Sequence, residues 1–333
     1  MGCIRIKACK INMKSKRKVE FINMSPKKVD MKQLVIEGMN KKPKQFPAWF
    51  LYDETGAKLF EKICKQPEYR LTEIEIDLIE RYASKINSEI GEGAIVEFGS
   101  GDPRKIIPIL RSRQKSTYVA LDISKNQLNK SIKKIKNSFL NINALGVCCD
   151  HSKLKALPNH YLINNQRLIG FFPGSSLGNF ESKEAINILI NLKSLLKGGP
   201  LLVGIDHPKS KEKLEAAYND RAGISSEFAL NLLHRLNREM KATFKLDDFI
   251  YDAKWQEEKS RVKMCLISKY SQNIKIFNKI WSFTRGEELI TEYSVKFTYK
   301  SFYNLVKCAG WSISNRWHDS NENFSILFLK PYN

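Results

Sequence analysis

The chain has no long apolar segment. None of its 333 residues belongs to a run approaching the ~20 apolar residues of a membrane-spanning helix. The N-terminus, which begins Met1-Gly2-Cys3, also lacks the apolar stretch of a secretory signal. We therefore expect a cytoplasmic protein with no membrane partner.

Cysteine and histidine are scarce and dispersed, which argues against the common metal-binding patterns. The seven cysteines include no Cys-x-x-Cys pair, and the five histidines are scattered. An odd, irregularly spaced set of cysteines also gives no disulfide framework. We expect free thiols in a reducing compartment and no metal. The cysteines are Cys3, Cys9, Cys64, Cys148, Cys149, Cys265 and Cys308.

Acidic residues are too few to balance the basic ones, and the formal net charge is +21. Residues 1–44 contain 13 Lys or Arg but only 3 Asp or Glu, so about half of the excess lies there. Such a segment can bind nucleic acid or an anionic surface, or it can simply be well solvated. Few aromatic side chains interleave it, as a base-stacking surface would require. We therefore treat residues 1–45 as a basic, partly disordered leader and do not expect a nucleic-acid partner.

Apolar runs alternate with helical patterns through the middle of the chain. This alternation is typical of a doubly wound α/β sheet. The predicted strands are 94–98, 117–121, 145–149, 168–172 and 200–205, and the predicted helices are 104–113, 125–137 and 183–197. A helix over 299–308 and strands over 311–318 and 323–330 follow, so the sheet is expected to end in an antiparallel hairpin.

The alternation is interrupted after Asp206. Residues 210–240 have helical periodicity, whereas residues 261–296 are typical of antiparallel strands. We expect this part to be a smaller α+β substrate-binding domain inserted into the core. The expected division is the leader 1–45, a core of 46–205 and 298–333, and an inserted domain of 206–297, with residues 46–60 packing against the insertion as part of a lid.

Residues 95–101, Ile-Val-Glu-Phe-Gly-Ser-Gly, are the most informative stretch: an apolar run that ends in a glycine turn. A second apolar run ends in Asp122, 23 positions after Gly99. In a βαβ unit this pattern places a backbone loop beside a nucleotide and a carboxylate on its ribose hydroxyls. The alternative is an ordinary strand-turn-helix in which Glu97 and Asp122 are merely solvated.

The glycine turn lacks the third glycine of a dinucleotide-binding fingerprint, because Asp102-Pro103 follows Gly101. The sequence therefore argues against NAD or FAD. A nucleoside without a diphosphate, of which S-adenosylmethionine is the common one, remains compatible.

A second glycine-rich loop, residues 172–180 (Phe-Pro-Gly-Ser-Ser-Leu-Gly-Asn-Phe), follows the fourth predicted core strand. Ligands bind at the carboxyl ends of strands in open α/β sheets. The loop could present carbonyl groups and the Asn179 amide to a small polar substrate. Alternatively, Asn179 caps a helix.

Together these motifs resemble those of the histidine Nα-methyltransferases of ergothioneine biosynthesis, over about residues 46–330. Ten segments carry the resemblance in order: Trp49–Asp53, Gly56–Glu61, Gln66–Tyr69, Val96–Gly101, Leu121–Ser124, Phe172–Phe180, Ala217–Asp220, Asn237–Glu239, Arg261–Met264 and Thr291–Ser294. The resemblance implies a Rossmann-like methyltransferase sheet and S-adenosylmethionine as the methyl donor. It also implies that the α-amine of L-histidine is methylated to trimethylhistidine (hercynine). We expect the enzyme to act as a monomer.

The resemblance also implies roles for individual residues. Tyr52 and Asn179 would be catalytic. Glu292 and Ser294 would bond the two imidazole nitrogens, beside Tyr69 and Met264. The substrate's α-carboxylate would contact Asn179 and Tyr218, and its α-amine would contact Tyr52, Asn179 and the Gly174 carbonyl. The implied cofactor-binding residues are Gly99, Ser100, Gly101, Lys105, Asp122 and Asp150.

Taken singly, these residues have simpler explanations. The three tyrosines could be half-buried packing residues, Met264 could belong to the core, and Glu292 and Ser294 could face solvent on an edge strand. The rival functions are methylation of another aromatic amino acid or indole amine, and methylation of RNA. The presence of Glu292 and Ser294 argues against an indole substrate, which would use the carboxylate poorly.

Overall fold

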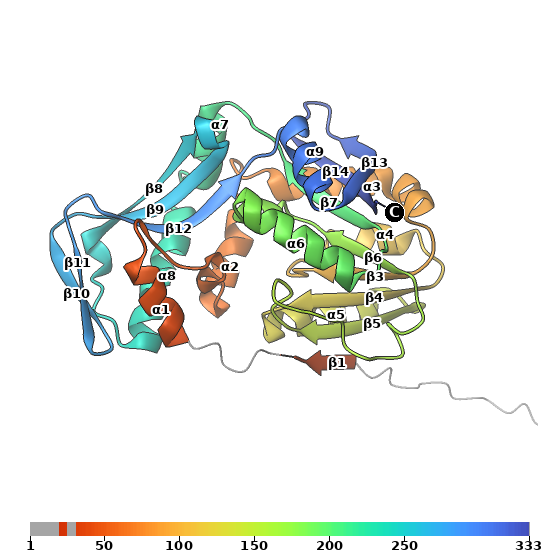
Figure 1. The fold of residues 1–333 in the computed structure, drawn as a ribbon, viewed down its shortest axis with the longest axis horizontal. Coiled ribbons are helices and arrows are strands. Elements are labelled where there is room, and N and C mark those ends of the chain that lie inside the picture. Colours follow the sequence, from red (N-terminus) through yellow and green to blue (C-terminus); the bar gives the residue numbers. More distant parts are fainter. Residues whose placement is uncertain (1–19, 25–30, 333) are drawn as a thin grey trace, which may run out of the picture.

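Eight strands form the larger sheet of the computed structural model, which describes residues 20–24 and 31–332 (Figure 1). Their order across the sheet is β1 (Glu20–Asn23), β5 (Ile142–Cys148), β4 (Ser116–Asp122), β3 (Ala94–Phe98), β6 (Leu168–Phe172), β7 (Leu201–Asp206), β14 (Phe324–Pro331) and β13 (Trp311–His318). The pairs from β1 to β7 are parallel, and β14 is antiparallel to both of its neighbours. The predicted doubly wound α/β sheet with a terminal hairpin is confirmed.

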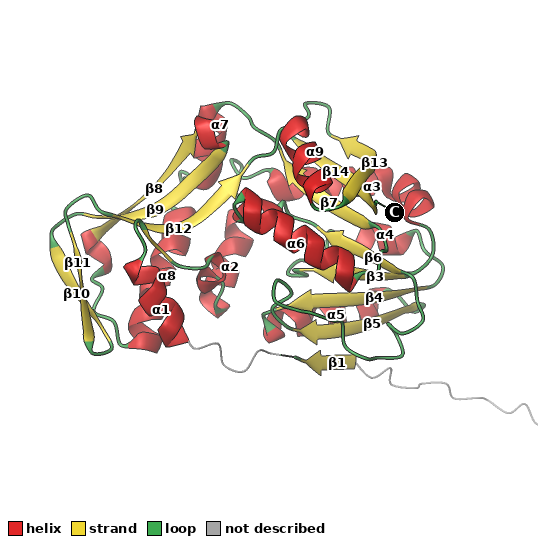
Figure 2. Ribbon diagram, viewed as in Figure 1, coloured by secondary structure: helices red, strands yellow, loops and turns green. Residues whose placement is uncertain are grey.

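Helices cover both faces of this sheet (Figure 2). One face carries α6 (Ser182–Leu195) and α9 (Tyr299–Cys308), and the other carries α3 (Leu71–Ile90), α4 (Ile107–Arg111) and α5 (Lys125–Ser138). Helix α5 illustrates why these helices form and pack on the sheet. The Ser124 side chain caps its first turn, and Leu128, Ile132 and Ile135 form a fully buried apolar stripe.

The second lobe is built on a four-stranded sheet with the order β2 (Lys44–Gln45), β12 (Glu288–Val295), β9 (Arg261–Ser268) and β8 (Phe249–Gln256). A separate hairpin, β10 (Gln272–Ile276) and β11 (Lys279–Phe283), extends it. The helices of this lobe are α1 (Met31–Asn40), α2 (Glu54–Ile63), α7 (Lys211–Tyr218) and α8 (Ile224–Met240), with the short 3-10 turns η1 (Ala48–Leu51), η3 (Leu246–Asp248) and η4 (Glu257–Lys259). This lobe lies beside the larger sheet in Figure 1.

The N-terminal part of the chain contributes to both lobes. Of the predicted leader 1–45, residues 1–19 and 25–30 lie outside the described residues. The described remainder forms β1, which pairs with β5, and α1 and β2, which belong to the second lobe. Val35 and Met39 of α1 are buried in the same apolar cluster as Phe46 and Phe50.

Several element boundaries differ from the sequence prediction; strand β5, for example, begins at Ile142 and not at residue 145. Helix α4 is shorter than the predicted 104–113 because Asp102 accepts a bond from the Arg104 backbone N–H in a turn, and Pro108 lies at the start of the helix. Strand β8 begins at Phe249, before the predicted antiparallel region. No described helix is long and apolar enough to span a bilayer.

The two lobes are tied together where the chain leaves the larger sheet and returns to it. The chain leaves after Asp206, the last residue of β7, and the backbone N–H of Phe297 donates to the Asp206 carbonyl (3.0 Å) on its return. The ends of residues 206–297 are therefore neighbours at one point of the core.

Candidate functional site

The predicted cofactor-binding residues and the loop with Gly174 and Asn179 lie near the carboxyl ends of the parallel strands, whereas the other predicted site residues belong to the second lobe. The strand order reverses at β3, since β4 and β5 lie on one side of it and β6 and β7 on the other. In sheets of this kind ligands bind in the crevice at that reversal. The turn after β3 and the loop after β6 lie next to this point.

The turn after β3 is fixed against β4. Gly99 has a φ of +82°, and the backbone N–H groups of Gly99 and Ser100 both donate to the Leu121 carbonyl (2.9 and 3.1 Å). Gly99 and Gly101 are exposed, whereas Ser100 between them is buried. A Cβ added at Gly101 would have no atom within 4 Å, so the turn borders open space.

Two carboxylates follow the next strands. Asp122 ends β4 and accepts a bond from the Ser124 backbone N–H (2.7 Å), yet burial raises the pKa of Asp122 to about 6. Asp150, just after β5, accepts from Ser152. Beside them the buried Nδ1 of His151 has no hydrogen-bond partner within the described residues. The open glycine turn, two acceptors and an unpartnered ring nitrogen fit a nucleoside, so these residues could hold an adenosyl group.

Lys105 and Glu75 form a buried ion pair that also holds the loop after β6. Lys105 Nζ lies 2.8 Å from Glu75 Oε2, and the Gly174 backbone N–H donates to both Glu75 oxygens (2.8 and 3.0 Å). Burial disfavours the charged form of Lys105, but Glu75 outweighs this effect, so the pKa of Lys105 is raised. A Cβ at Gly204 of β7 would lie 2.3 Å from Glu75 Oε1, so a glycine there makes room for the carboxylate.

The loop after β6 reaches across to the second lobe. It includes the 3-10 turn η2 (Ser176–Asn179), and a Cβ at Gly178 would lie 2.6 Å from the carbonyl oxygen of Val295 at the end of β12. Asn179 Nδ2 donates to Glu292 Oε1 on β12 (2.9 Å). Through this hydrogen bond, Asn179 connects the loop of the larger sheet directly to Glu292 of the second sheet.

Glu292 and Ser294 lie on one face of strand β12, since alternate residues of a strand share a face. Lys296 directly follows the strand and continues the same two-residue spacing. Burial raises the pKa of Glu292 to about 8, and the charge of Lys296 offsets this only in part. Met264 lies opposite Glu292 on β9, just past an irregularity in the pairing at Thr291. Ser294 is 7% exposed and Glu292 is half-buried, so the interpretation that both face solvent is wrong for Ser294.

A chain of polar contacts runs from Tyr218, at the end of α7, to Asp206. The Tyr218 hydroxyl lies 2.8 Å from Ser294 Oγ, and Lys296 Nζ donates to both (2.6 and 2.7 Å). The same ammonium lies 2.8 Å from Asp206 Oδ2. Asp206 also pairs with Lys209.

Aromatic rings border this polar cluster. Tyr69 meets Tyr218 edge to face (5.8 Å between ring centroids), and Tyr52 packs against Phe60 and Phe228 (5.4 and 5.2 Å). Burial raises the pKa values of Tyr52 and Tyr69, so both phenols stay neutral. The three tyrosines pack in the apolar cluster of the second lobe, which agrees with their interpretation as packing residues. Tyr69 also contacts Tyr218, which belongs to the polar cluster.

Three features of the site were not predicted from the sequence: Glu75, Lys296 and the interior role of Asp206. For Lys296 a signal existed, because it continues the two-residue period of Glu292 and Ser294. For Glu75 none existed, because an acidic residue in an amphipathic helix is usually solvated.

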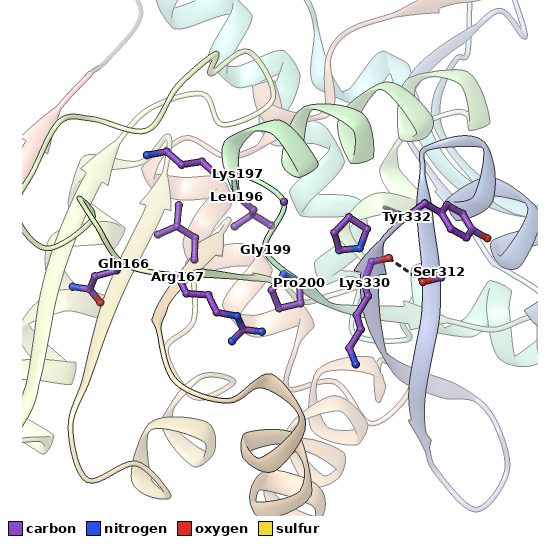
Figure 3. Close-up of a pocket in the computed structure, with 12 residues that line it drawn as sticks. Gln166, Arg167, Leu196, Lys197, Gly199, Pro200, Ser312, Lys330 and Tyr332 are labelled. Atoms are coloured by element: carbon purple, nitrogen blue, oxygen red, sulfur yellow. Dashed lines mark hydrogen bonds between the residues drawn. The ribbon is translucent and has the colours of Figure 1, made fainter.

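A cavity lies away from the predicted site (Figure 3). It has a volume of about 710 Å³ and is lined by residues that include Arg167, Pro200, Ser312 and Tyr332. Arg167 and Pro200 immediately precede β6 and β7, so the cavity is at the amino ends of the strands and shares no residue with the predicted site.

Known proteins similar to this chain are found both by sequence and by structure. Residues 31–331 match the family model described as histidine-specific, S-adenosylmethionine-dependent methyltransferase. A histidine N-alpha-methyltransferase of Mycobacterium tuberculosis is 29% identical over 300 residues, covering 88% of this chain and 92% of that protein. Ergothioneine biosynthesis protein 1 of Neurospora crassa is 33% identical over 229 residues, covering 63% of this chain but 25% of that protein. Among solved structures, an S-adenosylmethionine-dependent methyltransferase from Clostridium acetobutylicum aligns with a TM-score of 0.48 and 11% identity, covering 82% and 98% of the two chains.

Proposed function

The chain belongs to the family of histidine-specific, S-adenosylmethionine-dependent methyltransferases, and we propose that it methylates the α-amine of L-histidine. We propose further that three transfers give hercynine, as in ergothioneine biosynthesis. The observation that carries the proposal is the 2.9 Å bond from Asn179 to Glu292, which joins the loop after β6 to the strand that presents Ser294.

The Glu292–Ser294 pair supports an imidazole as the ring of the substrate. A buried carboxyl group needs a hydrogen-bonding partner, and Asn179 engages only Oε1 of Glu292. An imidazole can bond Glu292 with one nitrogen and Ser294 with the other. An indole has a single ring nitrogen and would leave one of the two groups without a partner.

Asn179 and Tyr218 are the proposed contacts of the α-carboxylate, while Tyr52, Asn179 and the Gly174 carbonyl orient the α-amine. Asn179 would then contact both the amino-acid backbone and Glu292, which sets the distance between the ring and the amine. Tyr69 and Met264 complete the proposed ring pocket.

Methyl transfer to nitrogen requires positioning more than acid–base chemistry. When bound, S-adenosylmethionine supplies a methyl group activated by a sulfonium. The amine must be neutral to attack, and the reference pKa of an α-amine is about 8, so no strong base is needed. Tyr52 and Asn179 would hold the amine in the position that the transfer needs. The raised pKa of Tyr52 keeps its phenol neutral, so its hydroxyl would accept the released proton only while passing its own proton on to water.

The product is a permanent cation, and the site has aromatic rings beside it. A cation over a tyrosine ring is stabilised by roughly 0.5–2 kcal/mol, depending on its desolvation. Tyr52, Tyr69 and Tyr218 would provide such contacts as methyl groups accumulate.

The remaining assignments belong to the same proposal. The adenosyl group would lie on the turn 99–101 and near Lys105, Asp122 and Asp150. The core would comprise 46–205 and 298–333, and the substrate-binding domain 206–297. Helix α1 and strand β2 supplement that domain. The protein would act as a monomer in the cytoplasm, where Cys64, Cys148, Cys149, Cys265 and Cys308 would stay reduced.

The test is calorimetric titration with L-histidine and with L-tryptophan, each in the presence of S-adenosylhomocysteine. Heat with histidine alone supports the proposal, and mass spectrometry of a reaction with S-adenosylmethionine then counts the methyl groups added. Heat with tryptophan alone would move the assignment to an indole substrate. The absence of heat with both ligands would contradict an amino-acid substrate and would favour a macromolecular one.

A further inference from the structure

Lys296 is a fully buried lysine whose role the proposed mechanism leaves open. Its side chain is 0% exposed, and its ammonium has three N–H donors. Three acceptors surround it: the Tyr218 hydroxyl at 2.6 Å, Ser294 Oγ at 2.7 Å and Asp206 Oδ2 at 2.8 Å. All three donors are therefore used within the protein.

Asp206 keeps this lysine charged. Burial disfavours the ammonium, but the Asp206 carboxylate outweighs it, so the pKa of Lys296 is raised. Asp206 is shared with Lys209, whose ammonium bonds the other carboxylate oxygen. Lys296 is therefore charged, and it donates to both hydroxyl groups.

That donation restricts what Tyr218 and Ser294 can do. Each oxygen accepts one N–H from Lys296, and the two oxygens lie 2.8 Å apart, so one hydroxyl must donate to the other. The two groups have two hydroxyl protons, and one of these forms the hydrogen bond between the two oxygens. The pair therefore offers a ligand one O–H donor on one oxygen and one acceptor lone pair on the other.

We propose that Lys296 is a positioning residue that fixes the donor and acceptor roles of Tyr218 and Ser294 toward the substrate. This inference rests on the proposed function, in which Tyr218 meets the α-carboxylate. A carboxylate accepts hydrogen bonds only, so Tyr218 must be the free donor. The Ser294 proton then points to Tyr218, and Ser294 accepts a bond from an imidazole N–H.

The arrangement selects one orientation of ring protons. The nitrogen facing Ser294 carries hydrogen, and the other nitrogen faces Glu292. Glu292 either donates to that nitrogen when the carboxyl is protonated or accepts from it when the carboxyl is ionised and the ring is an imidazolium. In both cases Ser294 is the acceptor.

The experiment measures the affinities of L-histidine and of histamine, which lacks the carboxylate, in the presence of S-adenosylhomocysteine. Wild type is compared with Lys296→Met, Tyr218→Phe and the double variant. Lys296→Met leaves Asp206 paired with Lys209, so its carboxylate keeps a partner. We expect Lys296→Met to weaken histidine binding by at least about tenfold, the value of one hydrogen bond to a charged group, with the affinity for S-adenosylhomocysteine unchanged.

The double variant separates positioning from general support of the fold. If Lys296 acts through Tyr218, the loss in the double variant is smaller than the two single losses combined. Independent, additive losses would overturn the proposal. Lys209→Met is the matched control: it removes the other lysine paired with Asp206 and touches neither hydroxyl group. An equal loss of histidine affinity in Lys209→Met would also overturn it.

Tyr218→Phe keeps the proposal testable if Lys296→Met does not fold. It should weaken histidine binding while leaving histamine binding nearly unchanged, and equal losses would show that Tyr218 is not the free donor. A wild-type protein that binds no histidine would overturn the proposed function and this inference together. Histidine binding that Lys296→Met leaves unaltered would overturn this inference alone.

Discussion

The ammonium of Lys296 lies 2.8 Å from the carboxylate of Asp206, and both side chains are buried. Asp206 ends β7 of the larger sheet, whereas Lys296 directly follows β12 of the second sheet. With the Phe297-to-Asp206 backbone bond, this ion pair fixes the two strands at the point where the site is assembled. The position of Glu292 and Ser294 relative to the loop after β6 is thereby set by the protein before any ligand binds.

Replacing Glu292 by alanine should weaken L-histidine binding by about 10- to 100-fold, the loss expected for a hydrogen bond to a charged group. The affinity for S-adenosylhomocysteine should be nearly unaffected, because Glu292 is assigned to the substrate's ring. Calorimetric titration with each ligand measures both values. Glu288→Ala is the control, since Glu288 lies on the same strand but pairs with Lys263. Equal weakening of both ligands in Glu292→Ala would mean that Glu292 supports the fold.

The raised pKa of Glu292 should make the stability of the ligand-free protein depend on pH. The carboxyl titrates near 4.5 when unfolded and at about 8 when folded, so the folded state binds the proton more tightly. Its contribution to stability is fully present below pH 4.5 and is lost as the pH rises through 8. Glutamine cannot ionise, so the melting temperature of wild type relative to Glu292→Gln should fall across this window. A constant difference from pH 4.5 to 8 would refute the assigned shift.

Glu75→Ala should destabilise the protein by about 3 kcal/mol or more, because it leaves a buried lysine without its partner. The same change removes the acceptor of the Gly174 backbone N–H. Urea denaturation measures the loss. Glu73→Ala is the matched control on the same helix: Glu73 pairs with Arg104 at the surface, and its removal should cost under about 1 kcal/mol. Similar losses in the two variants would contradict the role of Glu75.

Gly101→Val should separate cofactor binding from stability. The new side chain enters open space, and Gly101 is not among the glycines with positive φ, so the unfolding free energy should change by less than about 0.5 kcal/mol. The affinity for S-adenosylhomocysteine should fall by roughly tenfold or more, or about 1.4 kcal/mol. Gly99→Val is the contrasting variant. Gly99 has a φ of +82°, which strains a residue with a side chain, so this substitution should lower the free energy of unfolding. Unchanged cofactor affinity in Gly101→Val would place the adenosyl group elsewhere.

Local patterns in the sequence were sufficient for most of the larger sheet. β3, β6, α9 and β13 have the predicted limits, because each is an apolar or amphipathic run between turn-forming residues. β1 and β2 were missed, since short strands in a lysine-rich segment become strands only by pairing with β5 and β12.

The candidate site was predictable where residues belong to an ordered motif and not where a contact depends on the tertiary fold. Glu292 and Ser294 were singled out through resemblance to a known family. Glu75 could not be, because its burial depends on the space left by Gly204, far away in the chain. The two-residue period of β12 pointed to the face on which Lys296 lies, but its burial depends on Asp206 and the two hydroxyl groups that surround it.

The pairing of β2 with β12 has a consequence for how the chain folds during synthesis. Lys44 and Gln45 emerge early but pair with Leu289 and Ile290, which emerge late. The larger sheet is completed even later, since β7 pairs with β14, which comprises residues 324–331. Such long-range contacts form slowly, and incomplete sheets expose apolar surface and free strand edges. We therefore expect the second sheet to be complete only after β12 is synthesised, and the larger sheet only after β14, so that both sheets keep unpaired strand edges during most of translation.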